Sequence, residues 1–287
     1  MRIVMWNHRG GVGKTTLATH TAGLIAAAGS PVVLANLDPQ ANSIDRLRIP
    51  LASHTGAGGW DGGGSYADAL LDRGALPRLV ADSRRTNLTV ASVGPATIER
   101  LRDQRLSADD LEQRHRQLLQ RIAADTGGYV IVDCPPSVTP ASMAALAAAD
   151  GIVVPVATPG HDTLNALGDL VTAATDRHAV GRIVAVVPMF WPTRALHRRR
   201  HDAWRTRLAT LFDHHGIDLP VWDGFIRALP RLGIELEDSG LLVHELAATA
   251  TGNRQAAARL IDTANDLTAL IEWILHTTAT LTTAAGR

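Results

Sequence analysis

This chain of 287 residues has very little cysteine and lysine and no formal net charge. Cys134 is the only cysteine, which excludes a disulfide framework and a metal site of two cysteines within the chain, and is typical of a reducing cytoplasm. The formal net charge is zero, so nucleic-acid binding would need a local basic patch. Lys14 is the only lysine among 28 basic residues, which indicates a position that requires a compact ammonium group.

Long apolar runs are missing as well. The longest have the length of a helix or strand in a buried core, so we expect no transmembrane span and no membrane partner. The N-terminal segment turns polar and glycine-rich after six residues, so we expect no signal peptide. A chain of this length can bury an ample core, and no boundary divides it, so we expect one domain over residues 1–287.

Apolar strands alternate with helices along most of the chain. We expect strands at 2–6, 31–38, 87–93, 129–133, 151–157, 182–190 and 219–226, and helices at 15–28, 66–74, 97–124, 161–176, 195–214 and 254–275. Residues 52–65 are predicted to form a glycine-rich loop. The alternation predicts an α/β fold, a mostly parallel twisted sheet with helices on both faces, with ligands at the carboxyl ends of the strands.

A glycine-rich turn between the first strand and the first helix is typical of a phosphate-binding loop, although His8 stands where the common P-loop has its first glycine. Backbone N–H groups at this helix N-terminus can bind phosphate oxygens. Lys14 is placed to reach the β- and γ-phosphates, and the Thr15 hydroxyl to reach Mg²⁺. The predicted nucleotide-binding residues are Gly10, Gly11, Val12, Gly13, Lys14, Thr15 and Thr16.

Two carboxylates follow buried strands and can complete a site for a nucleotide with Mg²⁺. Asp133 ends a run of apolar residues, a pattern typical of the aspartate that holds the metal. Asp38 is a second metal candidate and the better candidate for orienting the attacking water. Each aspartate alone could be a turn or cap residue, but together with the P-loop they favour a nucleotide site.

Three motifs carry a family resemblance: RGGVGKTT at 9–16, LDPQAN at 37–42 and VIVDCPPS at 130–137. In order and spacing they resemble the deviant Walker A, A′ and B motifs of the ParA/MinD family of ATPases, in particular the ParA-type DNA-partitioning ATPases. The resemblance implies an ATP-driven sandwich dimer in which a signature lysine reaches the phosphates of the partner. Arg9 stands at that position and keeps its positive charge, so it joins Lys14 and Asp38 as a catalytic candidate. Asn36 is a second departure, because the family usually has an aspartate there.

A basic run at 193–207 is consistent equally with a surface that neutralises DNA phosphates without reading bases and with a solvated helix face. The resemblance supports DNA binding, since ParA-like proteins bind nonspecific DNA through late basic residues. The predicted DNA-binding residues are Arg194, Arg198, Arg205, Arg227 and Arg231. His197 and His201 have the spacing of zinc ligands, but no third ligand is evident, so we expect no zinc site.

These patterns predict a slow ATPase that uses ATP and Mg²⁺, dimerises on ATP and binds nonspecific DNA. The resemblance implies that it partitions a plasmid or chromosome with a ParB-like centromere-binding adaptor, in the cytoplasm and on the nucleoid. Two alternatives stay open: a ParA-like ATPase that positions a protein cargo, and a nucleotide-gated scaffold or regulator that no longer hydrolyses ATP.

Overall fold

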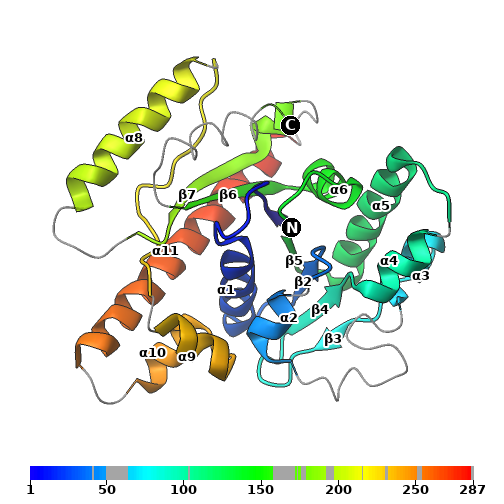
Figure 1. The fold of residues 1–287 in the computed structure, drawn as a ribbon, viewed down its shortest axis with the longest axis horizontal. Helices are drawn as coiled ribbons and strands as arrows, with labels where there is room; N and C mark the ends of the chain where they lie inside the picture. Colours follow the sequence, from blue (N-terminus) through cyan, green and yellow to red (C-terminus); the bar gives the residue numbers. More distant parts are fainter. Residues whose placement is uncertain are drawn as a thin grey trace.

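A largely parallel sheet runs through the middle of the molecule (Figure 1). The computed structural model describes residues 1–40, 42–49, 64–102, 104–157, 172, 174–175, 179–191, 197–214, 216–229, 232–250 and 254–285. The strands are β1 (Arg2–Met5), β2 (Val32–Asn36), β3 (Val80–Ala81), β4 (Leu88–Ser92), β5 (Tyr129–Asp133), β6 (Gly151–Ala157) and β7 (Ile183–Met189). Their order is β3-β4-β2-β5-β1-β6-β7, and only the edge pair β3 and β4 is antiparallel. The predicted α/β fold class is therefore confirmed.

The inner strand β1, with Trp6 directly after it, shows how the sequence divides the core in two. Successive side chains of a strand point to opposite faces of the sheet. Ile3 and Met5 pack in one buried cluster, and Val4 and Trp6 pack in the other. A strand buried on both faces has to be apolar throughout, which explains its continuous hydrophobic run.

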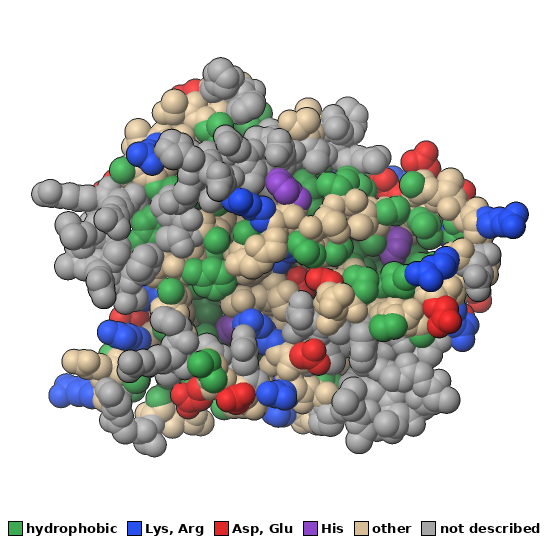
Figure 2. All heavy atoms as spheres, viewed as in Figure 1, with side chains coloured by type: hydrophobic (Ala, Val, Ile, Leu, Met, Phe, Trp, Pro, Cys, Tyr) green, Lys and Arg blue, Asp and Glu red, His purple; other side chains and the backbone are tan. Residues whose placement is uncertain are grey.

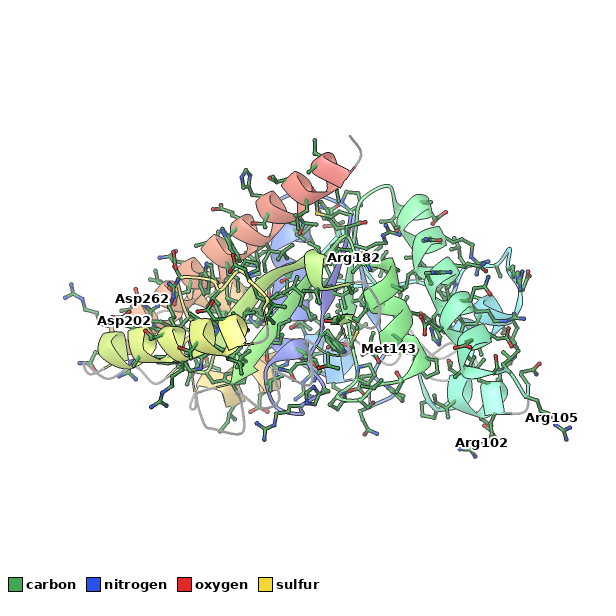
Figure 3. All side chains as sticks on the ribbon, turned by 90° about the horizontal axis from the view of Figure 1, so that it is seen from above. Arg102, Arg105, Met143, Arg182, Asp202 and Asp262 are labelled. Carbon is green, nitrogen blue, oxygen red and sulfur yellow. The ribbon has the colours of Figure 1, made fainter. Side chains whose placement is uncertain are left out.

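Helices cover both faces of the sheet, as predicted (Figure 1). On the face of Ile3 and Met5, the buried cluster includes residues of α1 (Lys14–Ala27), α2 (Asn42–Leu47), α9 (Leu232–Ser239), α10 (Val243–Thr249) and α11 (Arg254–Ala285). On the face of Val4 and Trp6 the elements are α3 (Ser65–Leu71), α4 (Pro95–Arg102), α5 (Ala108–Thr126), α6 (Pro140–Ala148), the 3-10 turn η3 (Val180–Arg182) and α8 (His197–His214). Arg102 and Arg105 lie at the opposite end of the molecule from Asp202 of α8 and Asp262 of α11 (Figure 3).

The single helix predicted over 97–124 is wrong, because the chain forms the two helices α4 and α5 there. Between them Arg105 adopts a positive φ of 47°, which a helix cannot contain. Ser107 then starts α5 as its N-cap, with its hydroxyl accepting a hydrogen bond from the backbone N–H of Asp110 at 3.1 Å. Both α4 and α5 have the spacing of apolar and polar residues that is typical of a helix, so this periodicity does not reveal the break between them.

The strand predicted over 219–226 is also wrong, since this segment makes only isolated bridges. Val221 bridges Val186 of β7, and Arg227 bridges Trp191 just beyond that strand. The last helix is longer than predicted and continues to Ala285. None of the described helices is long and apolar enough to cross a membrane. The loop predicted at 52–65 and the helix predicted at 161–176 lie almost entirely outside the described residues.

Candidate nucleotide site

The predicted phosphate loop connects β1 to α1, at the carboxyl edge of the sheet. Gly13 is the N-cap of α1 with φ of 98°, and Gly11 has φ of 70°. A side chain is strained at these angles, and a Cβ on Gly13 would lie 2.7 Å from the Met189 side chain. The positive φ therefore favours glycine at 13, at the N-terminus of α1 where backbone N–H groups can bind an anion.

The other loop residues divide by exposure. Gly10 and Gly11 are exposed, whereas Val12 is buried and anchors the loop. Thr15 and Thr16 lie half-buried at the start of α1. The loop thus presents backbone on its outer side and keeps one apolar side chain inside.

Lys14 is buried beneath the loop, and its Nζ donates a hydrogen bond to the backbone carbonyl of Arg9 at 2.7 Å. Burial lowers the pKa of Lys14, and the negative charges of Asp133 and Asp38 oppose this shift. The structure therefore brings the predicted catalytic lysine and both predicted carboxylates close enough to interact electrostatically.

Asn7 fixes the loop to the sheet, and the sequence analysis missed it. Its amide Nδ2 donates to the Pro155 carbonyl of β6 at 2.9 Å, and its Oδ1 accepts from the N–H of Arg9 at 2.9 Å. Arg9 itself is half-buried. The available signal was a polar residue placed directly after a buried strand, where its side chain can bind a neighbouring strand.

Asp133 ends β5 directly beside Met5 of β1 and is only 1% exposed. Within the described part of the chain, neither of its carboxylate oxygens has a hydrogen-bond partner. Burial raises the pKa of Asp133 to about 7, and the nearby charge of Asp38 adds to the shift. The Thr15 hydroxyl, which lies near this carboxylate without meeting hydrogen-bond geometry, and the charge of Lys14 act against it. A buried carboxylate without a partner is costly unless a cation binds it, so this donor fits Mg²⁺, which prefers oxygen ligands.

Asp38 lies two residues beyond β2, the neighbour of β5 in the sheet. The N–H of Leu37 donates to the Asp133 carbonyl at 2.9 Å, which holds the two acidic segments together. The Asp38 Oδ1 accepts a hydrogen bond from the N–H of Gln40 at 3.0 Å. Asp38 is only 8% exposed, so its carboxylate is both buried and held by the Gln40 N–H.

Of the predicted DNA-binding arginines, the structure describes the side chains of Arg205 and Arg227, and each forms an ion pair within the chain. Arg205 forms an ion pair with the exposed Asp223. Arg227 forms an ion pair with Asp266 of α11 and lies over the Phe225 ring, 5.7 Å from its centroid. Arg194, Arg231 and the side chain of Arg198 lie outside the described residues. The side chains of His197 and His201 also lie outside them, and the described residues contain no group of three or more His, Cys, Asp or Glu side chains that could hold a metal ion.

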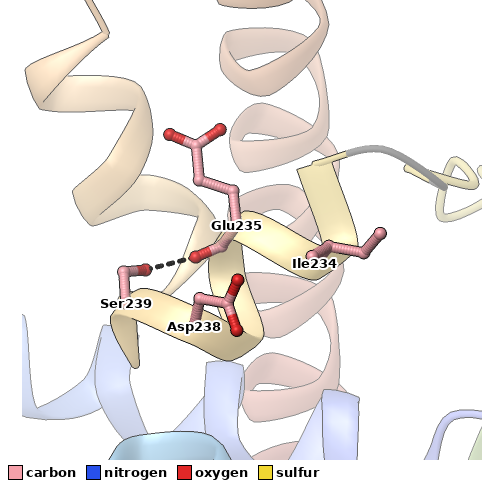
Figure 4. Close-up of a pocket in the computed structure, with 4 residues that line it drawn as sticks. All are labelled: Ile234, Glu235, Asp238 and Ser239. Carbon is pink, nitrogen blue, oxygen red and sulfur yellow. Dashed lines mark hydrogen bonds between the residues drawn. The ribbon is translucent and has the colours of Figure 1, made fainter.

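The described surface shows no broad basic region on the face in Figure 2, where Lys and Arg alternate with Asp and Glu. A shallow pocket of about 600 Å³ on α9 is lined by Ile234, Glu235, Asp238 and Ser239 (Figure 4). The Ser239 hydroxyl donates to the Glu235 backbone carbonyl and is therefore already bonded within α9. The other side chains of the lining are the carboxylates of Glu235 and Asp238 and the exposed Ile234. Asp238 also pairs with Arg48 at 3.8 Å, and a lining with two carboxylates does not favour phosphate.

Comparison with known proteins agrees with this geometry. The AAA domain family AAA_31 matches residues 1–176. The chromosome partitioning protein ParA of Myxococcus xanthus is 34% identical over 156 residues, which are 54% of this chain and 51% of that protein. The chain therefore spans about half the length of the curated relatives it matches.

Two solved structures share the fold. McdA from Cyanothece superposes with a TM-score of 0.64 at 19% identity, covering 93% of this chain and 98% of that one. Cobyrinic acid a,c-diamide synthase from Mycobacterium smegmatis, with a bound ATP analog and magnesium, gives a TM-score of 0.58 at 21% identity, covering 83% of this chain and 92% of that one. At such low identity these likenesses establish the fold alone.

Proposed function

The chain belongs to the AAA_31 family and is a ParA/MinD-type ATPase, and from this premise we propose that it is a slow, partner-stimulated switch driven by ATP and Mg²⁺. We propose as well that residues 1–287 act as one domain. The Asp133 carboxylate carries the proposal, because it is buried without a hydrogen-bond partner beside the only lysine of the chain.

The residues of the site divide into three roles. The backbone of the loop from Gly10 to Thr16, with Lys14, would hold the phosphates. Thr15, Asp38 and Asp133 would hold Mg²⁺, which supplies positive charge against the phosphate oxygens when bound. Asp38 would also orient the attacking water. ATP would close a homodimer in which Arg9 reaches the phosphates of the second copy.

The ATP-bound dimer would bind nonspecific DNA through the basic residues of α8 and the segment after it, and partition a DNA cargo with a ParB-like adaptor. The proposed contacts are Arg194, Arg198, Arg205, Arg227 and Arg231. The kinship with chromosome partitioning proteins supports this function. It would place the protein on the nucleoid in the cytoplasm.

A second candidate function keeps the ATPase and replaces the DNA cargo with a protein assembly. Arg205 and Arg227 favour it, because both already have carboxylate partners within the chain. Zero net charge favours it too, since no global basic field attracts DNA.

DNA binding across a salt series decides between the two functions. With ATP and Mg²⁺, the wild type should bind two unrelated duplexes equally, with a log-log salt slope of about −0.9 for each phosphate neutralised. Replacing Arg198 and Arg205 with alanine should weaken binding to both duplexes and make the slope shallower. The control replaces Arg102 and Arg105, two exposed arginines at the far end of the molecule, and should leave affinity unchanged. No DNA affinity of the ATP-bound wild type at low salt would contradict the DNA-partitioning function and leave the protein cargo or the nucleotide-gated scaffold.

A further inference from the structure

Asn36 lies at the centre of the site and has no role in the functional scheme so far. It is the last residue of β2, in register with Ser92 of β4 on one side and Asp133 of β5 on the other. Its side chain is completely buried. A buried amide beside the backbone of Asp38 can either fill space in the core or orient the Asp38 segment.

The hydrogen bonds of Asn36 point to orientation. Its Nδ2 donates to the backbone carbonyl of Asp38 at 2.8 Å, and its Oδ1 accepts from the backbone N–H of Asp38 at 3.3 Å. A backbone carbonyl can only accept and a backbone N–H can only donate, so these partners fix which way the amide points. A carboxylate at position 36 could satisfy the N–H but not the carbonyl.

Ser92 accepts the second amide proton of Asn36 on the other side. Its hydroxyl donates to the carbonyl of Val93 at 3.2 Å, and its oxygen accepts from Asn36 Nδ2 at 2.6 Å. Both protons of the Asn36 amide are therefore used, one on Ser92 and one on Asp38. Aspartate at 36 would lose the bond to the Asp38 carbonyl, and would bond Ser92 only if that hydroxyl turned away from the Val93 carbonyl to donate to the carboxylate.

Asp38 repeats the arrangement one step further along the chain. Asn36 accepts from the N–H of residue 38, and the Asp38 carboxylate accepts from the N–H of Gln40. Each bond spans two residues, as in an Asx turn. The direction of the Asp38 carboxylate thus depends on a chain of bonds that starts at the buried amide of Asn36.

Charge favours the amide as well. Asp38 and Asp133 already place two carboxylates in this buried region, and the Asp38 charge raises the pKa of Asp133. A third carboxylate at 36 would add like charge where solvent cannot screen it. A neutral side chain at this position keeps both functional carboxylates available.

We propose that Asn36 is a positioning residue that holds the Asp38 segment through its amide, and that the amide, not a carboxylate, is the functional group at this position of the chain. The expected effect of Asn36 on ATP turnover rests on the proposed ATPase function. That Asn36 holds the Asp38 backbone rests only on the two hydrogen bonds between them.

Amide hydrogen exchange of the nucleotide-free protein tests the structural half. Asn36→Ala should speed exchange of the Asp38 and Gln40 amides by about tenfold or more, because the first bond of the chain is lost. The Trp6 amide, bonded to the Val153 carbonyl, should be unchanged. Asn87→Ala removes another asparagine that bonds a backbone carbonyl, at Ala26, and should leave the Asp38 and Gln40 amides as in the wild type. Unchanged exchange in Asn36→Ala overturns the proposal.

Steady-state ATP hydrolysis tests the catalytic half. Asn36→Ala and Asn36→Asp should each lower kcat by about tenfold and change KM for ATP less than about threefold, since positioning acts on turnover more than on binding. Asn87→Ala should keep both constants. An unchanged kcat in Asn36→Ala would reduce Asn36 to packing, and a raised kcat in Asn36→Asp would show that a carboxylate is the better group. A wild type without ATP turnover would refute the proposed function, while the exchange experiment would still decide whether Asn36 holds Asp38.

Discussion

The ammonium of Lys14 and the backbone carbonyl of Arg9 are joined by a hydrogen bond of 2.7 Å across the phosphate loop. The loop thus satisfies its own buried lysine, whose pKa is lowered by burial. The ammonium has three N–H donors, so Lys14 can keep this bond and still donate to phosphate oxygens. The bond joins the P-loop lysine to the backbone of the residue proposed to contact the second copy.

Arg9 should matter for hydrolysis more than for ATP binding. Arg9→Ala is expected to abolish stimulated turnover and spare ATP affinity, because Lys14 bonds the backbone of residue 9, which alanine keeps. Arg9→Lys should match or exceed the wild type, since it retains the positive charge. The measurement is ATPase rate against ATP affinity, with the exposed Arg102→Ala as the control. Equal turnover in all these proteins would show that Arg9 is only a surface residue.

Asp133 should make the metal-free protein less stable as pH rises. Its folded pKa of about 7 lies above the usual value of 3.8, so its contribution to stability is complete below about pH 4 and is lost as pH rises through about 7. Asp133→Asn removes this dependence and should be the more stable protein at about pH 8 and not at about pH 4. Urea unfolding of both proteins without nucleotide or Mg²⁺ measures the difference. An identical pH dependence in the two proteins would contradict the buried, unpartnered carboxylate.

Arg85 should be the most costly arginine to remove. It pairs with Asp82 and Glu245, and the Arg85 and Asp82 side chains are only 4% and 2% exposed. Arg85→Ala leaves Asp82 buried without its partner and should cost about 3 to 5 kcal/mol of the free energy of unfolding.

The matched control is Arg100→Ala, which breaks an ion pair whose two side chains are 51% and 52% exposed. Solvent screens that pair, so its loss should cost at most about 1 kcal/mol. Thermal or urea unfolding compares the two variants. An equal decrease in the free energy of unfolding would show that burial does not determine how much each ion pair stabilises the fold.

The sequence predicted what depends on local pattern. Apolar runs located the six parallel strands, and the motif spacing placed Lys14 beside Asp38 and Asp133. It did not predict contacts between distant residues, such as the bond from Asn7 to Pro155 or the ion pair from Arg227 to Asp266. Those depend on the folded arrangement of strands and helices, which periodicity does not encode.

Backbone conformation was the second limit. The break between α4 and α5 turns on the positive φ of Arg105, and arginine gives no sign of that angle in the sequence. The segment after α8 lies beside β7, and the N–H of Val186 donates to the Pro220 carbonyl, but it forms only two isolated bridges and no continuous ladder.

Light scattering with ATP and Mg²⁺ tests the central claim most directly. The account predicts that the wild type doubles its 30.5 kDa mass with ATP and stays a monomer with ADP. Lys14→Ala should stay a monomer in ATP, because the phosphates lose their buried ammonium, and Asp38→Ala should stay a dimer, because the attacking water is no longer oriented. A wild type that remains a monomer with ATP and Mg²⁺ would contradict the ATP-driven switch.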